Sequence, residues 1–338
     1  MRKKRCDSLV SSVNSTSAKP VAMTITCFAL VYVIWGSTYL GMKIAVTKIP
    51  PLFVGGSRFF LAGTTLMLIL AALGKFKFHW LGKPAYWRGA FLVGAFMMLG
   101  ANGLLCMSLG RPGLPSGLAA LIVATTPLWM LLLDRWQTGV GKFTPQIIAG
   151  LAVGLFGVSV LMSGKIFATS DSAPVDVIGC LMVLASCILW SVGGIVGRQV
   201  SQPPHPLACS AMQMISGGFM LLAFSACFEA WKPIGEIPWN DSAWIAWLYL
   251  AVFGSMIGFT AFVWLLHHVS AASVSTYAYV NPLVAIMLGW FFLDEQPGLR
   301  TAVATIFILG GVVVIQLARR TSGRARVTTV ASSDSRAK

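Results

Sequence analysis

A short run of polar side chains near residue 277 could form hydrogen bonds with a small molecule. The run lies in an otherwise apolar stretch and consists of Ser273, Thr276, Tyr277 and Asn281. Their spacing of i, i+3, i+4 and i+8 places them on one face of a helix. Polar groups are costly against lipid, so this face should point into the protein or into a water-filled cavity. Close packing of neighbouring helices through hydroxyl-bearing residues is the alternative explanation.

Two prolines mark positions where we expect helices to break. Pro282 follows Asn281 directly, and Pro127 stands 155 residues earlier, after Thr126. A proline removes a backbone donor and frees a carbonyl about one turn earlier. Breaks at corresponding positions of two membrane helices point to a transport site near the midplane.

Arg58 is a charge placed well within a hydrophobic run. An arginine deep in a membrane is costly, so it usually faces a cavity or a partner. It could bind an anionic or carboxylate group of a solute. Alternatively, it could snorkel to the interface or bond carbonyls at a helix end. Lys43 and Arg198 stand at the ends of apolar runs, where we expect interfacial anchors.

Aromatic residues in the middle of apolar runs are the remaining candidates for solute contact. Trp35 and Trp190 lie away from the ends, where membrane tryptophans usually gather, although core packing would explain them almost as well. Aromatic walls with a few polar groups suit an amphipathic organic solute. The residues expected to contact a solute are Trp35, Tyr39, Arg58, Asn102, Trp190, Tyr277 and Asn281.

The sequence lacks the residues that several kinds of chemistry require. No Asp or Glu lies deep in an apolar run, so a buried proton relay or a multi-carboxylate cation site is not expected. Metalloprotease, nucleophile-elbow, Walker A and dinucleotide motifs are missing from the sequence, and its seven cysteines include no CxxC pair. We therefore expect no enzyme activity, catalytic residue, metal or cofactor. The adjacent pair His267–His268 is interpreted as a solvated interfacial pair.

The elements that would position these residues are membrane-spanning helices. Hydrophobic residues make up 57% of the 338 residues and charged residues 10%, which excludes a soluble enzyme, a disordered chain and a secreted disulfide scaffold. About 20 apolar residues are needed to cross a bilayer as a helix. Ten runs of this kind are present, at roughly residues 24–45, 52–73, 87–108, 114–133, 144–163, 176–197, 206–229, 244–267, 272–293 and 299–317.

The net charge of +15 is better explained by topology than by a nucleic-acid partner. With the N-terminus inside, 18 of the 25 Lys and Arg residues fall in inner segments and tails, as the positive-inside rule requires. Residues 1–20 and 318–338 are then basic cytoplasmic tails. Both termini are predicted to be cytoplasmic.

An internal repeat appears at a constant offset of 155 residues. The offset pairs Trp35 with Trp190, Lys43 with Arg198, Gly63 with Gly218, Gly103 with Gly258, and Pro127 with Pro282. Each repeat, residues 24–163 and 176–317, holds five expected spans, and an odd number inverts the second copy in the membrane. The predicted fold is an all-α integral membrane protein of ten transmembrane helices in two inverted five-helix repeats. Many secondary transporters share this plan and work by alternating access, although a duplicated scaffold without a transport role is the alternative.

The sequence resembles the EamA family of the drug/metabolite transporter superfamily. The resemblance rests on W-G-S-T-Y-L (35–40), P-P-L-F-V-G-G-S-R-F-F-L-A-G (50–63), P-S-G-L-A-A-L-I-V-A-T-T-P-L (115–128) and S-T-Y-A-Y-V-N-P (275–282). It implies export of small organic solutes such as amino acids, metabolites or drugs across a bacterial inner membrane. It also matches Arg58 to an arginine common in the family's second span. Where the family often has Gly-Glu after span nine, this chain has Asp294-Glu295, and Asp134-Arg135 closes span four.

The expected function is therefore a secondary exporter with a small-molecule substrate in the lipid bilayer and no nucleic-acid partner. A passive facilitator or channel is one alternative. A non-transport membrane protein, such as a receptor or a lipid-handling enzyme using the histidine pair, is the other. Monomer and homodimer both stay open.

Overall fold

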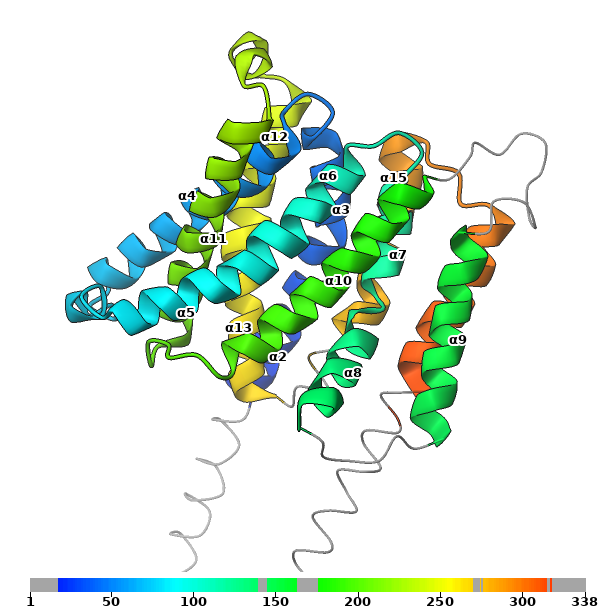
Figure 1. Cartoon of the computed structure of the whole chain (residues 1–338), viewed down its shortest axis with the longest axis horizontal. Coiled ribbons are helices and arrows are strands. Elements are labelled where there is room, and N and C mark those ends of the chain that lie inside the picture. Colours follow the sequence, from blue (N-terminus) through cyan, green and yellow to red (C-terminus); the bar gives the residue numbers. More distant parts are fainter. Residues whose placement is uncertain are drawn as a thin grey trace, which may run out of the picture.

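The computed structural model describes residues 18–138, 145–162, 176–269, 274, 276–314 and 317. All regular elements in these ranges are helical, and the helices form one bundle (Figure 1). Ser273 and, except for residues 18–20, the two predicted basic tails lie outside the described residues.

The first half of the chain contributes five apolar helical segments. Two of them contain a π-helical stretch in the middle, and the fourth is broken into two helices. The elements are α2 (Ala18–Leu30), η1 (Val31–Trp35) and α3 (Gly36–Ala45); α4 (Pro51–Ala72); η2 (Phe78–Trp80); α5 (Pro84–Gly94), η3 (Ala95–Asn102) and α6 (Gly103–Leu109); α7 (Ser116–Val123) and α8 (Thr126–Thr138); and α9 (Pro145–Met162).

The second half has a similar order of elements. Its helices are α10 (Val177–Gly197), α11 (Pro206–Phe228), η4 (Lys232–Glu236), α12 (Ser242–Tyr249), η5 (Leu250–Ile257), α13 (Gly258–His268), α15 (Tyr277–Leu293) and a last helix, Leu299–Val314. The offset of 155 recurs in these bounds: Pro51 and Pro206 begin α4 and α11, and the π-helices η3 and η5 are both 8 residues long.

Length and composition make seven of the helices in the described ranges able to cross a membrane, and three more apolar helices are shorter. Large apolar side chains such as Leu68 (64% exposed), Met287 (66%) and Ile306 (71%) lie on the outside of the bundle, as a lipid-facing surface requires. The all-helical, multi-pass prediction is confirmed. The count of ten spans and the inverted relation between the halves stay predictions.

Helices that the offset relates pack against each other in opposite directions. In the α4–α11 pair, a Cβ added to Gly63 would lie 2.8 Å from the carbonyl oxygen of Ala211, and one added to Gly218 would lie 2.5 Å from the amide nitrogen of Phe60. Glycine is therefore needed at both crossings, because the two backbones touch. The last helix packs on α9 in the same manner, with Gly311 against Gly154 (Figure 1).

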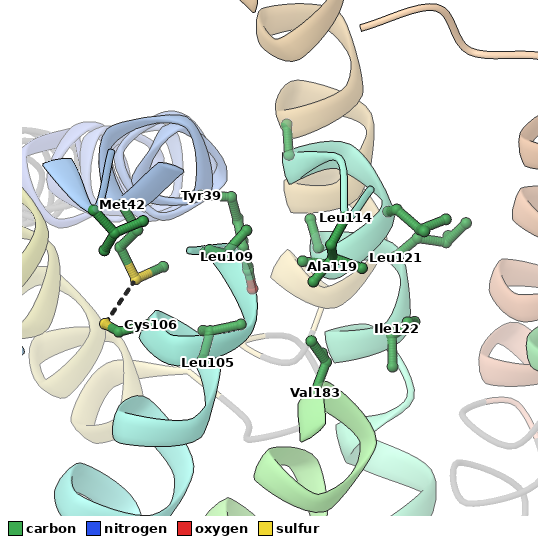
Figure 2. Close-up of a cluster of buried hydrophobic side chains, with 14 of the residues drawn as sticks. Tyr39, Met42, Leu105, Cys106, Leu109, Leu114, Ala119, Leu121, Ile122 and Val183 are labelled. Atoms are coloured by element: carbon green, nitrogen blue, oxygen red, sulfur yellow. Dashed lines mark hydrogen bonds between the residues drawn. The ribbon is translucent and has the colours of Figure 1, made fainter. Parts of the chain in front are cut away.

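The bundle has two ends. We call one of them the capped end; it holds the connections 46–50, 110–115, 229–241 and 294–298. The tail end holds the start of α2 and the connections 73–83 and 198–205 (Figure 1). A buried apolar layer lies toward the capped end, where α3, α6, α7 and α10 meet (Figure 2). Ile49, Leu109 and Leu114 are each 1% exposed within it.

Candidate functional site

A cavity of about 140 Å³ lies in the middle of the bundle, between helices of both halves. This space exceeds what one water needs by about tenfold, so a small organic molecule can enter it. All seven expected contact residues and both prolines line the cavity: Trp35, Tyr39, Arg58, Asn102, Pro127, Trp190, Tyr277, Asn281 and Pro282. The structure thus brings together residues that are up to 247 positions apart in sequence. That they bind a solute stays a prediction.

Arg58 reaches the cavity from the second turn of α4 and does not snorkel. Its side chain is 3% exposed, and Nη2 donates to Asn102 Oδ1 at 3.1 Å. The same nitrogen lies 3.6 Å from Met42 Sδ, and the guanidinium carbon lies 4.4 Å from the centre of the Phe59 ring. These contacts are all with neutral groups, so they hold the guanidinium in place without cancelling its charge.

Asn102 is oriented by a π-helical turn. It ends η3, where the wider turn brings the Met97 carbonyl within reach, and Asn102 Nδ2 donates to that oxygen at 2.9 Å. This bond fixes the amide so that Oδ1 faces Arg58. π-Helical turns in helices are frequently found at functional sites. Here η1, η3 and η5 each supply cavity residues, namely Trp35, Asn102 and Ser255.

An aromatic cluster forms the wall of the cavity on its tail side. Trp35 Nε1 donates to the Gly254 carbonyl at 3.2 Å, which fixes the indole against η5. The indole centre lies 4.8 Å from the Phe262 ring and 5.3 Å from the Tyr277 ring, the latter edge-on. Such aromatic pairs stabilise one another, so this wall is preorganised.

The residues of the polar stripe around residue 277 have two different roles. Tyr277 and Asn281 line the cavity. The Thr276 hydroxyl instead pairs with the Tyr32 hydroxyl at 2.6 Å. With its amide nitrogen turned toward them, Asn281 donates to the carbonyl oxygens of Tyr277 and Tyr32 at 3.2 Å each. Asn281 therefore also joins α15 to η1, so the cavity and helix-packing explanations both hold for parts of the stripe.

The two prolines behave differently. The chain breaks at Ala124–Thr125, between α7 and α8, directly before Thr126-Pro127, as expected. The expected break at Pro282 is wrong, because α15 runs through it from Tyr277 to Leu293. Pro282 is only the sixth residue of that helix, so it removes a single bond near the helix start.

Several cavity residues were not identified from the sequence. They are mainly small or apolar: Thr38, Met42, Ser186, Cys187, Ser255 and Phe259. A lone hydroxyl inside an apolar run, as at Ser186 and Ser255, is the signal that could have indicated them. Met42 and Phe259 carry no such signal, because cavity and core residues of these types look alike.

Exposure along the cavity wall changes from one end to the other. Tyr39 and Met42 on α3 are buried, whereas Trp35, which ends η1 nearer the tail end, is half-buried. On α10, Cys187 is buried and Trp190, nearer the tail end, is half-buried. On α15, Asn281 is buried and Tyr277, nearer the tail end, is half-buried. The cavity is therefore closed toward the capped end and more accessible toward the tail end.

Two glutamates close the capped end by bonding helix N-termini. Glu295, after α15, accepts from the Ser116 amide at 2.6 Å, the Ser116 hydroxyl at 2.9 Å and the Gly117 amide at 3.3 Å. Glu229, after α11, accepts from the Leu52 amide at 2.8 Å and the Phe53 amide at 3.1 Å. Carboxylates are favoured at helix N-termini, where backbone N–H groups lack partners. Each glutamate thus joins two helices related by the offset of 155.

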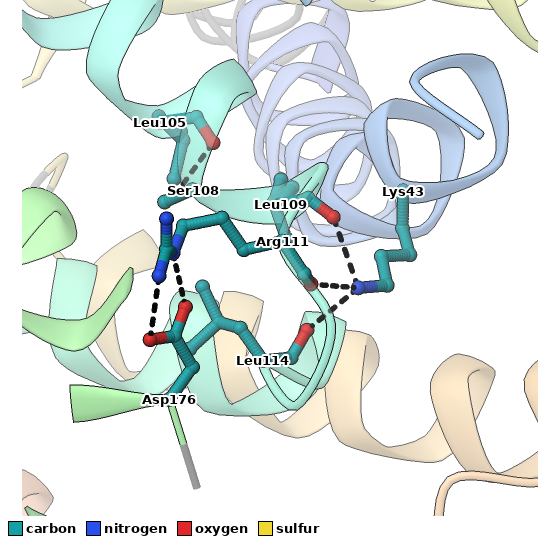
Figure 3. A network of polar contacts seen from close by, with 7 residues as sticks. All are labelled: Lys43, Leu105, Ser108, Leu109, Arg111, Leu114 and Asp176. Carbon is teal, nitrogen blue, oxygen red and sulfur yellow. Dashed lines mark hydrogen bonds and ion pairs between the residues drawn. The ribbon is translucent and has the colours of Figure 1, made fainter. Parts of the chain in front are cut away.

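Lys43 holds the α6–α7 connection over the capped end (Figure 3). Its Nζ donates to the carbonyl oxygens of Leu109 (2.9 Å), Arg111 (3.2 Å) and Leu114 (2.9 Å). Lys43 is therefore a structural tie, and its position at a membrane interface stays a prediction. Arg111 in the same connection pairs with Asp176, which precedes α10. The Arg111 guanidinium holds the pKa of the Asp176 carboxyl below its usual value, with help from the Gly179 amide.

Comparison with known proteins identifies the family. The model of the EamA-like transporter family matches residues 22–163 and again residues 177–317. The chain belongs to the EamA-like transporter family. It is therefore a multi-pass transmembrane transporter.

Relatives in this EamA-like family match over most of their length. The chain is 35% identical to the uncharacterized inner membrane transporter YedA of Escherichia coli K12, covering 86% of this chain and 90% of that protein. It is 26% identical to the uncharacterized transporter YoaV of Bacillus subtilis 168, covering 83% and 92%. A crystal structure matches with a TM-score of 0.60 at 20% identity, covering 89% of this chain and 98% of that one, which supports the fold alone.

Proposed function

We propose that this protein is a secondary transporter that exports small organic solutes from a bacterial cytoplasm by alternating access. The observation that carries the proposal is the central cavity, which both halves line and which is closed toward the capped end and more accessible toward the tail end. Its wall combines aromatic rings with a few polar groups, as small-molecule sites do. The similarity to an inner membrane transporter supports the cytoplasmic membrane as its location.

The basic residues supply the orientation of the proposed transporter. Lys75, Lys77 and Lys83 lie in one connection at the tail end, and Arg198 lies in another. By the positive-inside rule, these residues support a cytoplasmic position for this end. The cavity is then accessible from the cytoplasm, where an exported solute would enter, and the capped end faces outward.

The pairing of helices supports alternating access. Helices α4 and α11 are related by the offset of 155 and pack in opposite directions, as do α9 and the last helix. Two inverted halves of similar structure can exchange conformations, which turns a cavity open at one end into a cavity open at the other. The π-helices η3 and η5, at the same offset, provide matching irregular segments beside the cavity.

The test is counterflow in proteoliposomes with labelled amino acids, organic acids and organic amines. We expect at least one class to accumulate against unlabelled solute on the far side, which separates a carrier from a passive channel. Asn281→Ala should reduce the rate about tenfold or more. Met287→Ala, on the exposed face of the same helix, is the matched control and should leave the rate unchanged. No counterflow of any class, with Asn281→Ala also silent, would contradict the proposal.

A further inference from the structure

The cavity contains a buried positive charge and no negative one. Arg58 is the only charged side chain among the described residues that line it. Its contacts are an amide oxygen, a thioether sulfur and an aromatic ring, none of which carries a negative charge. A buried charge without a countercharge is strongly unfavourable, because no ion pair offsets the cost of taking the charge out of water. The cavity wall thus carries an electrostatic imbalance that a ligand of the right charge would correct.

Nearby carboxylates do not correct this imbalance, because they have other partners. Glu229 bonds the Leu52 and Phe53 amides and the Ser225 hydroxyl, the last at 2.6 Å. Glu295 bonds Ser116 and Gly117 at the start of α7. Neither of them lines the cavity. Both are held at the capped end by helix N-termini.

Two donors in the cavity wall lack a partner within the described part of the chain. They are the Arg58 Nε atom and the Ser255 hydroxyl, in residues that are 3% and 2% exposed. Buried polar groups are nearly always hydrogen-bonded, so a pair of unpartnered donors in one cavity points to a ligand with acceptor atoms. The Asn102 amide already fixes one edge of the guanidinium. The free Nε is a donor that a carboxylate oxygen can use.

We propose that the transported solute is a small organic anion whose carboxylate binds Arg58, with its apolar part against the aromatic wall. This inference rests on the proposed function and names the solute class for the same cavity. Trp35, Phe259 and Tyr277 offer ring faces and edges to an apolar or aromatic body. An ammonium group would find no carboxylate in the described cavity wall. The site therefore favours a carboxylate over the corresponding zwitterion, amine or alcohol.

Such a solute carries charge, which adds an independent readout. A monoanion that leaves the cytoplasm moves down an inside-negative membrane potential, whereas a zwitterion gains nothing from it. A potassium gradient with valinomycin sets this potential in proteoliposomes. Efflux of a labelled carboxylate should become faster when the inside is made negative and slower when it is made positive.

The binding test uses a matched series with one carbon skeleton: 3-phenylpropionate, L-phenylalanine, 3-phenylpropylamine and 3-phenylpropanol. Quenching of tryptophan fluorescence in the purified full-length protein reports binding, because Trp35 and Trp190 line the cavity. We expect 3-phenylpropionate to bind at least tenfold more tightly than the other three compounds. Arg58→Met should remove this preference, and Arg58→Lys, which keeps the charge, should retain part of it.

A second measurement keeps the test decisive if a variant folds poorly. Arg58→Met should raise the melting temperature of the ligand-free protein, and 3-phenylpropionate should raise that of the wild type alone. Equal or tighter binding of the amine, the alcohol or the zwitterion would overturn the inference, as would a wild type that binds no member of the series. Counterflow of an amine would overturn the anion class while leaving the transporter intact. Absence of all counterflow would instead overturn the proposed function.

Discussion

The two ends of the bundle are held in different ways. At the capped end, Lys43, Glu229 and Glu295 bond backbone groups of other helices. At the tail end, the contacts include the ring of His268 stacked on Trp264 at 3.9 Å and Lys83 Nζ 5.2 Å from the Tyr86 ring. Charges at the capped end therefore fix helix termini in one arrangement. This difference indicates which contacts would have to break for the cavity to open to the other side, as the proposed function requires.

The difference does not follow from the repeat itself. The offset of 155 relates Glu229 to Gly74 and Glu295 to Val140, so the acidic residues have no acidic counterparts. The repeats agree along their helices but not in the acidic residues that bond helix N-termini at the capped end. In the proposed exporter, two unequal ends would give the two states unequal stability.

The largest expected effect comes from Lys43→Met, which leaves three carbonyl groups without their charged donor. Each such bond contributes about 1.5–3 kcal/mol when the donor is charged, so loss of the set should favour opening of the capped end. The readout is labelling of a cysteine at Val46 by a membrane-impermeant reagent, in a background without the seven native cysteines. We expect labelling to become at least tenfold faster.

Lys48→Met is the matched control for this substitution. Lys48 lies five residues further along and pairs with Asp241, but its side chain is 52% exposed. Exposed ion pairs contribute little, so labelling at position 46 should not change. Equal changes in the labelling rate for Lys43→Met and Lys48→Met would show that the Lys43 hydrogen bonds do not hold the capped end closed.

Glu295→Gln should have a smaller effect in the same direction. A glutamine keeps one acceptor oxygen but loses the charge that favours the start of α7, which is worth about 1 kcal/mol. We expect about fivefold faster labelling at position 46. Glu236→Gln, in the connection before α12, should leave labelling unchanged. An unchanged labelling rate at position 46 in Glu295→Gln would show that Glu295 does not hold the capped end closed.

Low pH should loosen the Arg111–Asp176 pair, with a still smaller effect. Because the pKa of the Asp176 carboxyl is lowered in the folded state, the pair stabilises the protein above the ordinary aspartate value of about 3.9. Its contribution is lost only as the pH falls through the lower, folded value. The wild type and Asp176→Asn should therefore differ by a constant labelling ratio from pH 8 to 5 and converge below about pH 4. Convergence already at pH 6 would contradict the cause given for the lowered pKa.

The smallest effect is expected for a substitution at the tail end. His268→Ala should leave counterflow unchanged, because the ring is exposed and stacks on Trp264 outside the cavity. A lipid-handling enzyme that uses the histidine pair predicts loss of activity instead. Loss of function in this variant, with Asn281→Ala active, would favour that alternative.

The sequence allowed the cavity to be predicted better than its gates. A polar stripe, mid-helix tryptophans and a buried arginine are costly in a membrane, so they identified residues from four helical segments that meet in one place. The gates depend on contacts such as Glu295 with Ser116, which are 179 residues apart and have no local pattern. Pro282 shows a different limit, because a proline early in a helix removes one bond without ending the helix.

The most direct test of the account compares two single cysteines in oriented vesicles. Val123 lines the cavity and is half-buried, whereas Val46 lies at the capped end and is 8% exposed. In inside-out vesicles, an impermeant reagent should label a cysteine at position 123. In right-side-out vesicles the reagent should label neither position of the protein that keeps Lys43. Labelling from this side should appear only when Lys43 is replaced by Met. Labelling of position 46 in right-side-out vesicles of the otherwise unaltered protein, with position 123 protected from inside-out vesicles, would contradict the account.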